Sequence, residues 1–279
     1  MEEIRSNSVN MSYIEKAEAL QERPEFKTLG IQATNLKDCY VLTPKKFGDN
    51  RGALGQIDIE PLELLGFQGL KKIIKSDNPL RGVIRGMHLQ KGFSAQTKVV
   101  RCISGKVMDV VIDLREDSET FGQWTGVELT PENDKSLFVP RGFAHGYLAA
   151  EDNTSFLYFV DNAYDKPSEA GLLYNDEDVN IDWKSILESY KISNDELNFS
   201  DKDKKHPGLY RLKEIEKEEA IMLRHDMIMN INPKYLDEEG QRKLFELENR
   251  ISNIDKILRT DSCKKLVLNP KPVSYMGEC

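Results

Sequence analysis

A histidine and a lysine ten residues apart in this chain have the side chains needed to form an enolate beside a ketone. His88 ends the run RGMH and Lys98 ends the run AQTK, between strand-like stretches. Histidine can accept a proton, and a lysine ammonium can stabilise the oxyanion that develops, by roughly 3 kcal/mol. The pair indicates proton abstraction next to a carbonyl group. A lone histidine in a β-core is more often structural, so the spacing alone leaves that alternative open.

The composition describes an ordinary water-soluble globular protein. The chain has 279 residues, of which 39% are hydrophobic and 31% charged, with a formal net charge of −8. General nucleic-acid and membrane-surface binders rely on excess Lys and Arg, so both classes are disfavoured. An anionic substrate would therefore need a local cluster of cations.

Cysteine usage and the first residues predict a cytoplasmic location. The four cysteines form no C-x-x-C pair and are too sparse for a disulfide framework or a structural zinc site: Cys39, Cys102, Cys263 and Cys279. The first thirty residues are acidic and lack an apolar signal region. No apolar run approaches the roughly 18 residues of a membrane span.

Short strand-like runs dominate the middle of the chain. They cover residues 38–42, 56–59, 97–103, 106–114, 126–129, 136–139, 146–149 and 154–160, and turn signals separate them. No long helix intervenes, which favours an antiparallel sandwich or barrel over a parallel α/β sheet.

Helical patterns lie at both ends of the chain. The capping-box pattern Ser12 to Glu15 opens a short helix that should stop before Pro24. After Pro207, residues 209–229 and an apolar stripe over 244–258 predict an antiparallel helical hairpin, separated by Asn232-Pro233. Packing of this hairpin on the β-core is favoured over a dedicated oligomerisation element, because two heptads are too short for a coiled coil.

Five motifs, which follow one another along the chain, are more specific than the general pattern of short strands. They are FGDNRG (47–52), RGMHLQ (85–90), DVVIDLR (109–115), SETFGQW (118–124) and VPRGFAHG (139–146). Together they resemble the dTDP-4-dehydrorhamnose 3,5-epimerase family, whose members are cupins. The resemblance spans about residues 31–205. It divides the chain into an N-terminal helical extension (1–30), a cupin epimerase domain (31–205) and a C-terminal helical hairpin extension (206–279).

The resemblance implies a mainly β cupin jelly roll that acts as a homodimer without a metal or other cofactor. The implied substrate is a nucleotide-diphosphate 4-keto-6-deoxy sugar. Its 4-keto group acidifies the hydrogens on C3 and C5, so each can leave as a proton and return to the opposite face. Such a reaction needs a base, an acid on the other face and a cation near the carbonyl oxygen.

Family positions assign roles to four side chains. His88 corresponds to the base, Asp203 to the carboxylate that pairs with it, Tyr158 to the proton donor and Lys98 to the lysine near the keto oxygen. A carboxylate on one ring nitrogen would fix the tautomer and stabilise the imidazolium. Without the resemblance, Tyr158 reads as a core residue and Asp203 as part of a solvated charged run.

The resemblance also implies a binding site for the nucleotide diphosphate. Its cationic or phosphate-facing residues are Arg51, Arg85, His145 and Lys202, and Tyr164, Glu169 and Gln56 line the same site. Guanidinium groups bind phosphate oxygens in bidentate fashion, which would supply the local cation cluster. The simpler interpretation of Arg51 is a turn ion pair with Asp49, worth under ~1 kcal/mol.

Four positions depart from the family pattern. Gln56 replaces a glutamate, and Ile73 and Lys75 fall in a run where the family has Gln-x-Asn-x-Ser. These changes alter which nucleotide base can form hydrogen bonds with the site, so the sequence does not identify the base of the nucleotide. Phe159 stands where the family often has a lysine.

Other functions remain possible on the same scaffold. A sugar 3,4-ketoisomerase also enolises its substrate but moves the carbonyl, and a non-catalytic sugar-nucleotide-binding module would need no acid and base. A metal-dependent cupin oxygenase is disfavoured because Gln90 stands where a second histidine ligand belongs.

Overall fold

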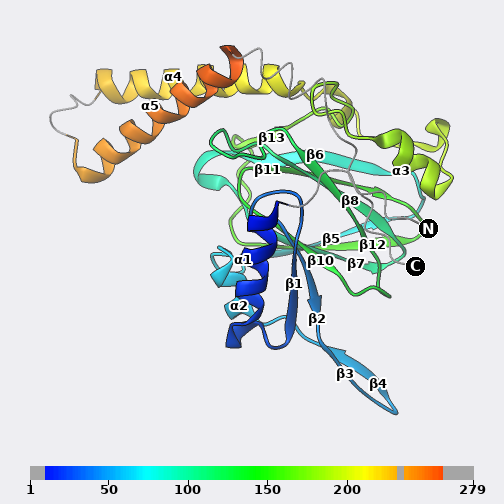
Figure 1. Ribbon diagram of the computed structural model, residues 1–279. Coiled ribbons are helices and arrows are strands. Elements are labelled where there is room, and N and C mark those ends of the chain that lie inside the picture. Colours follow the sequence, from blue (N-terminus) through cyan, green and yellow to red (C-terminus); the bar gives the residue numbers. More distant parts are fainter. Residues whose placement is uncertain (1–9, 231–235, 260–279) are drawn as a thin grey trace.

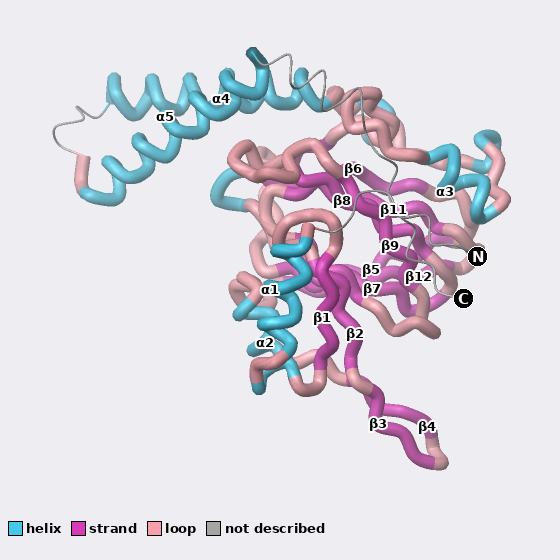
Figure 2. The backbone as a smooth tube through the Cα atoms, in the orientation of Figure 1, coloured by secondary structure: helices cyan, strands magenta, loops and turns pink. Residues whose placement is uncertain are grey.

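Two antiparallel β-sheets face each other and form the core of the protein (Figures 1 and 2). The computed structural model describes residues 10–230 and 236–259. The larger sheet has the order β1 (Leu29–Ala33), β2 (Tyr40–Pro44), β10 (Ser136–Val139), β7 (Lys98–Ser104), β12 (Thr154–Val160) and β5 (Lys72–Asn78). The smaller has the order β13 (Glu169–Gly171), β6 (Ile84–Gln90), β11 (Phe143–Ala149), β8 (Val107–Asp113) and β9 (Trp124–Leu129). The predicted β-sandwich is confirmed.

Helices cover the outer faces of both sheets. Alternate strand residues point to opposite faces, so one strand contributes to two packed layers. In β8, Val111 packs between the sheets, whereas Val110 and Ile112 pack outward near α3 (Trp183–Tyr190). Every residue of β8 is buried, which explains its nearly continuous apolar sequence.

The N-terminal segment packs on the outer face of the larger sheet. Helix α1 (Met11–Gln21) buries Tyr13 and Ala17 in a cluster with strand residues, and a short 3₁₀ turn follows at Pro24–Phe26. The side chain of Asn10 caps the helix by accepting from the Ser12 backbone. The predicted cap at Ser12 is therefore wrong, because the helix begins at Met11.

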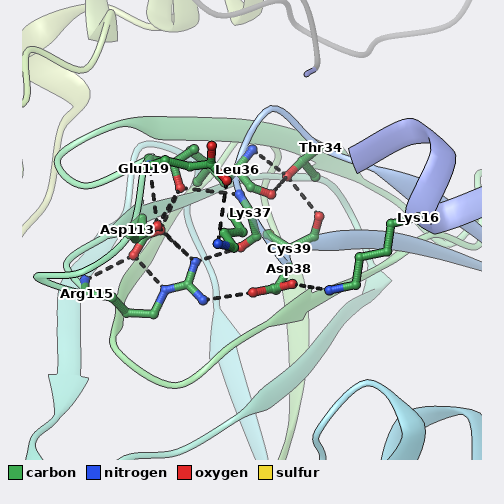
Figure 3. A network of polar contacts seen from close by, with 11 residues as sticks. Lys16, Thr34, Leu36, Lys37, Asp38, Cys39, Asp113, Arg115 and Glu119 are labelled. Carbon is green, nitrogen blue, oxygen red and sulfur yellow. Dashed lines mark hydrogen bonds and ion pairs between the residues drawn. The ribbon is translucent and has the colours of Figure 1, made fainter. Parts of the chain in front are cut away.

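A chain of charged side chains fastens α1 to the sandwich (Figure 3). Lys16 Nζ lies 2.5 Å from Asp38 Oδ1, and Arg115 binds the other oxygen of Asp38 at 3.1 Å. Arg115 also pairs with the buried Asp113 at 2.7 Å. Burial alone would raise the pKa of Asp38, but hydrogen bonds and charge from Lys16 and Arg115 lower it. These connected ion pairs therefore join helix α1 to the β-sandwich.

Residues 46–64 differ from the sequence expectation. The predicted strand at 56–59 is wrong, because helix α2 (Ile59–Leu64) starts within it. A hairpin of β3 (Lys46–Asp49) and β4 (Gly52–Gly55) precedes the helix. All eight strand residues of the hairpin are exposed, and it projects away from both sheets (Figure 1). Strands β1, β5, β6 and β13 were also absent from the sequence prediction.

The C-terminal helices form the expected hairpin. Helix α4 (Leu209–Asn230) packs along α5 (Glu238–Arg259), and the predicted break at Asn232-Pro233 lies outside the described residues. The first turns of α4 bury Leu209 and Leu212 in the β-core, and ion pairs of Glu219 with Lys91 and of Arg250 with Glu116 join both helices to the β-region. The predicted packing of the hairpin on the β-core therefore holds for this part, whereas its far end extends beyond the sandwich (Figure 1). In the described residues, no helix combines the length and apolar character that a membrane crossing requires.

A buried cation joins α4 to the sandwich. Lys213 is 1% exposed, and its ammonium donates to the Leu114 carbonyl, Glu116 and Glu216 at 2.7–2.9 Å. Arg250 of α5 also reaches Glu216, at 3.2 Å. The cation thus compensates carboxylates from both the helix and the β-core.

We expect Lys213→Met to lower the free energy of unfolding by about 3 kcal/mol, because it leaves buried carboxylates undercompensated. Lys217→Met is the matched control, since its partner Asp255 and Lys217 itself are partly exposed. The control should lose less than ~1 kcal/mol. Urea unfolding measures both; equal losses would contradict the proposed anchor.

Candidate active site

Seven polar residues from both sheets and one short turn meet between the sheets, and we call them the interior cluster. Its members are Arg85 and His88 (β6), Lys98 (β7), Asp109 (β8), His145 (β11), Tyr158 (β12) and Asp203, which opens the 3₁₀ turn Asp203–Lys205. His145 and His88 are direct partners across β11 and β6. Strand pairing brings His145 beside His88, and the turn at Asp203 places its carboxylate against His88 from 115 positions away in the sequence.

His88 and Asp203 form a hydrogen-bonded pair. His88 Nε2 lies 2.7 Å from Asp203 Oδ1, and the Gly86 backbone N–H donates to the other carboxylate oxygen at 3.3 Å. Burial alone would raise the pKa of Asp203, but the bonds from His88 and Gly86 lower it. Asp203 is only 5% exposed in its side chain, so it is not part of a solvated linker.

His145 and Asp109 form a second pair deeper in the sandwich. Their Nε2 and Oδ1 atoms lie 2.7 Å apart, and both side chains are buried. Burial raises the pKa of Asp109, although His145 and Lys98 counteract the shift, and burial lowers the pKa of His145. Within the described residues, Asp109 Oδ2 has no hydrogen-bond partner. The carboxylate is therefore available to hold a neighbouring cation.

The ammonium group of Lys98 is the cation that interacts with the negative charge of Asp109. Desolvation lowers the pKa of Lys98 to about 8, and the negative charge of Asp109 opposes that shift. An ammonium in a poorly solvated place interacts with a developing negative charge more strongly than one in water. Lys98 is thus suited to stabilise an oxyanion near neutral pH.

Tyr158 presents a phenol to the same interior. Its ring meets His145 edge-on, with centroids 5.6 Å apart, and packs on Phe156 at 5.0 Å. Burial, together with Tyr147 and Asp109, raises the pKa of Tyr158 well above its usual value. The hydroxyl therefore stays protonated and can give a proton away. The neighbouring Phe159 faces the opposite side and packs in the cluster that contains Tyr13 and Ala17.

Predicted binding residues form two groups: Arg85 and His145 belong to the interior cluster, and Lys202, Glu169 and Tyr164 lie beside it. Lys202 pairs with Glu169 at 2.5 Å, and the Tyr164 hydroxyl donates to the same carboxylate at 3.0 Å. Hydrogen bonds from Lys202 lower the pKa of Glu169, and the charge of His88 contributes. Arg85 Nε donates to Asn78 at 3.0 Å, which leaves its terminal nitrogens to bind an anion.

Two predicted binding residues stand apart from the interior cluster. Arg51 is in the turn of the projecting β3–β4 hairpin and pairs with Asp49 at 2.5 Å, as the simpler interpretation predicted. Gln56 donates to Asp58, at 3.3 Å. Among the residues that the structure describes, no contact of either side chain with His88 or Tyr158 is seen. Ile73 and Lys75 are exposed on the edge strand β5.

Sequence reasoning missed three residues of the site. Asp109 pairs with His145, Asn78 holds Arg85, and His206 packs edge-on against His88 with ring centroids 5.5 Å apart. Asp109 carried a usable signal, since a carboxylate inside a strand of apolar residues is costly unless paired. His206 is three residues after Asp203 and carried no such signal.

The geometry combines a base held by a carboxylate, a protonated phenol and an ammonium inside a β-sandwich. Such a set suits an isomerase that moves protons at a carbon next to a carbonyl group. A model of the dTDP-4-dehydrorhamnose 3,5-epimerase family matches residues 33–211, so the chain belongs to this family. The isomerase class and the cupin fold predicted from the sequence are confirmed.

Individual relatives agree with this assignment. The dTDP-4-dehydrorhamnose 3,5-epimerase of Salmonella typhimurium is 43% identical over 157 residues, which cover 54% of this chain and 83% of the relative. The crystal structure of the Elizabethkingia anophelis enzyme of that name is 41% identical, with a TM-score of 0.60, covering 65% of this chain and 96% of that one. A Legionella pneumophila epimerase in complex with dTDP-4-keto-L-rhamnose is 32% identical, with a TM-score of 0.58 and coverages of 65% and 93%.

Proposed function

We propose that this protein epimerises a dTDP-linked 4-keto-6-deoxyhexose at C3, C5 or both. The observation that carries the proposal is the meeting of the His88–Asp203 pair, Lys98 and Tyr158 within one β-sandwich. The ligand named for the Legionella pneumophila relative supports dTDP over the other nucleotides that the sequence left open. A cytoplasmic location, favoured by cysteine usage, belongs to the same proposal.

In this mechanism, His88 takes a proton from the carbon next to the 4-keto group. The C–H electron pair forms the enolate, whose negative charge on the 4-oxygen is stabilised by Lys98. Asp203 stabilises the imidazolium that results. Tyr158 then donates its proton to the opposite face of the same carbon, which inverts the centre and leaves a phenolate. Proton exchange with solvent restores Tyr158 and His88, so no oxidation occurs.

The residues around the cluster would hold the nucleotide diphosphate. Arg85 and Lys202 supply positive charge, Tyr164 supplies an exposed aromatic ring, and Glu169 orients Tyr164 and Lys202. Asp109 orients His145, whose second ring nitrogen would donate to an anionic oxygen once the negative charge of the bound substrate favours the imidazolium. These contacts would provide the local cation cluster that an acidic protein needs for a dianion.

A homodimer would bring the two remote residues to the site. The β3–β4 hairpin exposes Phe47 and Leu54, and the edge strand β5 exposes Ile73 and Ile74. An exposed edge and an unpaired apolar hairpin favour association between two copies. In such a dimer, the hairpin of one copy would contribute Arg51 and Gln56 to the site of the other.

Proton exchange in deuterated water tests the proposed function. The purified protein is incubated with a dTDP-linked 4-keto-6-deoxyhexose, and proton NMR follows C3 and C5. Deuterium at either carbon together with an inverted product is expected. Movement of the carbonyl without exchange at C5 would identify a 3,4-ketoisomerase. No exchange with dTDP-, UDP-, CDP- or GDP-linked sugars would favour a binding module.

The lowered pKa of Lys98 predicts a falling rate above about pH 8. Below that pH the ammonium is charged and stabilises the enolate, whereas above it the neutral amine does not. The exchange rate should therefore fall by up to about tenfold per pH unit above the pKa. In Lys98→Arg the rate is lower but this decline should disappear, because a guanidinium stays charged. An unchanged decline in Lys98→Arg would assign it to another group.

A further inference from the structure

His206 adds a third metal-ligating side chain behind the His88–Asp203 pair. Its Nε2 lies 3.5 Å from Asp203 Oδ1, the same oxygen that His88 Nε2 contacts at 2.7 Å. One ligand atom from each of the three residues lies within 4.8 Å of the others. Two imidazoles and a carboxylate therefore converge on one point.

The Nε2 atom of His206 is buried without a hydrogen bond. Its side chain is 9% exposed, and among the described residues this nitrogen has no hydrogen-bond partner. Leaving a buried polar atom without a hydrogen bond is unfavourable, because the atom has lost its contacts with water. The ring packs against Gly171, where any Cβ would come within 2.3 Å of it. The imidazole is thus confined beside Asp203, and its Nε2 approaches the carboxylate without forming a hydrogen bond.

We propose that His88, Asp203 and His206 bind one divalent transition-metal ion, such as Zn²⁺, and that this ion inhibits the enzyme. Zn²⁺ bonds of about 2.0–2.1 Å in a tetrahedral site place ligand atoms roughly 3.3 Å apart. The Asp203–His206 separation already agrees with that value, and the His88–Asp203 pair would open by roughly 0.6 Å. Two histidines, one carboxylate and a water would complete four ligands.

The nitrogen ligands select the kind of ion. Imidazole suits Zn²⁺, Co²⁺ and Cu²⁺, whereas Mg²⁺ and Ca²⁺ prefer oxygen ligands. The nearby positive charge of Lys202 opposes metal binding, but Lys202 is paired with Glu169. The single carboxylate among the three ligands leaves the bound ion with a net positive charge.

Inhibition follows from the tautomer of His88. In the free pair, one ring nitrogen contacts Asp203 and the other is able to accept a proton. An ion on Nε2 replaces the contact with Asp203, and the proton that the neutral ring keeps must reside on Nδ1. That nitrogen then has no lone pair for the substrate proton. Asp203, bound to the ion, no longer stabilises an imidazolium.

Binding is tested on chelator-treated full-length protein by equilibrium dialysis against Zn²⁺ and by visible absorption with Co²⁺. We expect one ion per chain and the intense bands of four-coordinate Co²⁺. His206→Gln should weaken binding by at least about 10–100-fold, the range seen for changes around metal ligands. His225→Gln is the control, since His225 lies on α4 with a largely exposed side chain.

Equal binding by the wild type and His206→Gln would overturn the proposal, as would loss of binding in His225→Gln alone. Circular dichroism checks the fold of each variant, and His88→Gln replaces His206→Gln if the latter does not fold. These readouts do not depend on the enzyme being active.

The inhibition step rests on the proposed function and has its own test. Zn²⁺ should stop proton exchange in the wild type, and a chelator should restore it. For His206→Gln, with each rate compared to its own metal-free value, the inhibiting concentration should rise at least about tenfold. Binding without inhibition would refute the role of the ion while keeping the site. Absence of exchange even without metal would refute the proposed function instead.

Discussion

His88→Asn is expected to abolish proton exchange at C3 and C5. Asparagine occupies nearly the same space and can still bind Asp203, but it cannot accept a proton at neutral pH. Loss of a general base reduces the rate by about 10²–10⁴-fold. Proton NMR in deuterated water measures the rate directly, and circular dichroism verifies the fold.

The matched control for this prediction is His225→Asn. His225 is exposed on α4, away from the β-sandwich, so exchange should continue at the wild-type rate. Full exchange in His88→Asn would remove the proposed base, whatever the control does. A loss in both variants would point to a general effect of histidine replacement.

Tyr158→Phe is expected to separate proton removal from inversion. The phenylalanine ring keeps the packing on His145 and Phe156, and only the hydroxyl is lost. His88 can still take the proton and return deuterium to the same face, whereas delivery to the opposite face should slow by about 10²–10⁴-fold. The measurements are deuterium incorporation and the configuration of the recovered sugar.

A suitable control is Tyr174→Phe, because Tyr174 stacks on Phe199 in the apolar layer between the smaller sheet and α3 and lies outside the proposed site. That variant should invert its substrate like the wild type. Normal inversion by Tyr158→Phe would mean that another group supplies the proton. Loss of deuterium incorporation as well would show that the hydroxyl acts before the proton returns.

Much of the fold was predictable because local patterns agreed with the final packing. Runs such as 106–114 and 154–160 are apolar and bounded by turn residues, and they form β8 and β12. The C-terminal hairpin follows from the apolar stripe over 244–258 and the helical pattern over 209–229, and the two helices pack on each other. In these segments, sequence period and burial coincide.

Other segments depend on surroundings that local patterns do not contain. Strand β5 is mostly exposed and lies at a sheet edge, so its sequence lacks a clear alternation. Strands β3 and β4 form a separate two-stranded sheet within the described part of the chain, and their turn residues Asn50 and Arg51 give a weak signal. Residues 56–59 read as a strand but lead into α2, because Pro61 suits the first turn of a helix.

For the site, the family resemblance predicted both the base His88 and its pairing with Asp203, whereas the local sequence pattern predicted neither the pair nor the role of Asp203. The 2.7 Å contact between His88 and Asp203 depends on a turn 115 residues away in sequence. The approach of His206 to Asp203 depends on Gly171, whose lack of a side chain makes room for the ring. Contacts of this kind arise from tertiary packing.

The position of Phe159 has a consequence for the first helix of the chain. Adjacent residues of β12 face opposite sides, so the strand that presents Tyr158 inward also presents Phe159 to the aromatic and aliphatic layer shared with Tyr13 and Ala17. Removal of helix α1 would expose that layer to water and weaken the packing that holds the strand carrying Tyr158. Helix α1 therefore supports β12 from the side opposite Tyr158. Its removal should lower both the free energy of unfolding and the rate of epimerisation.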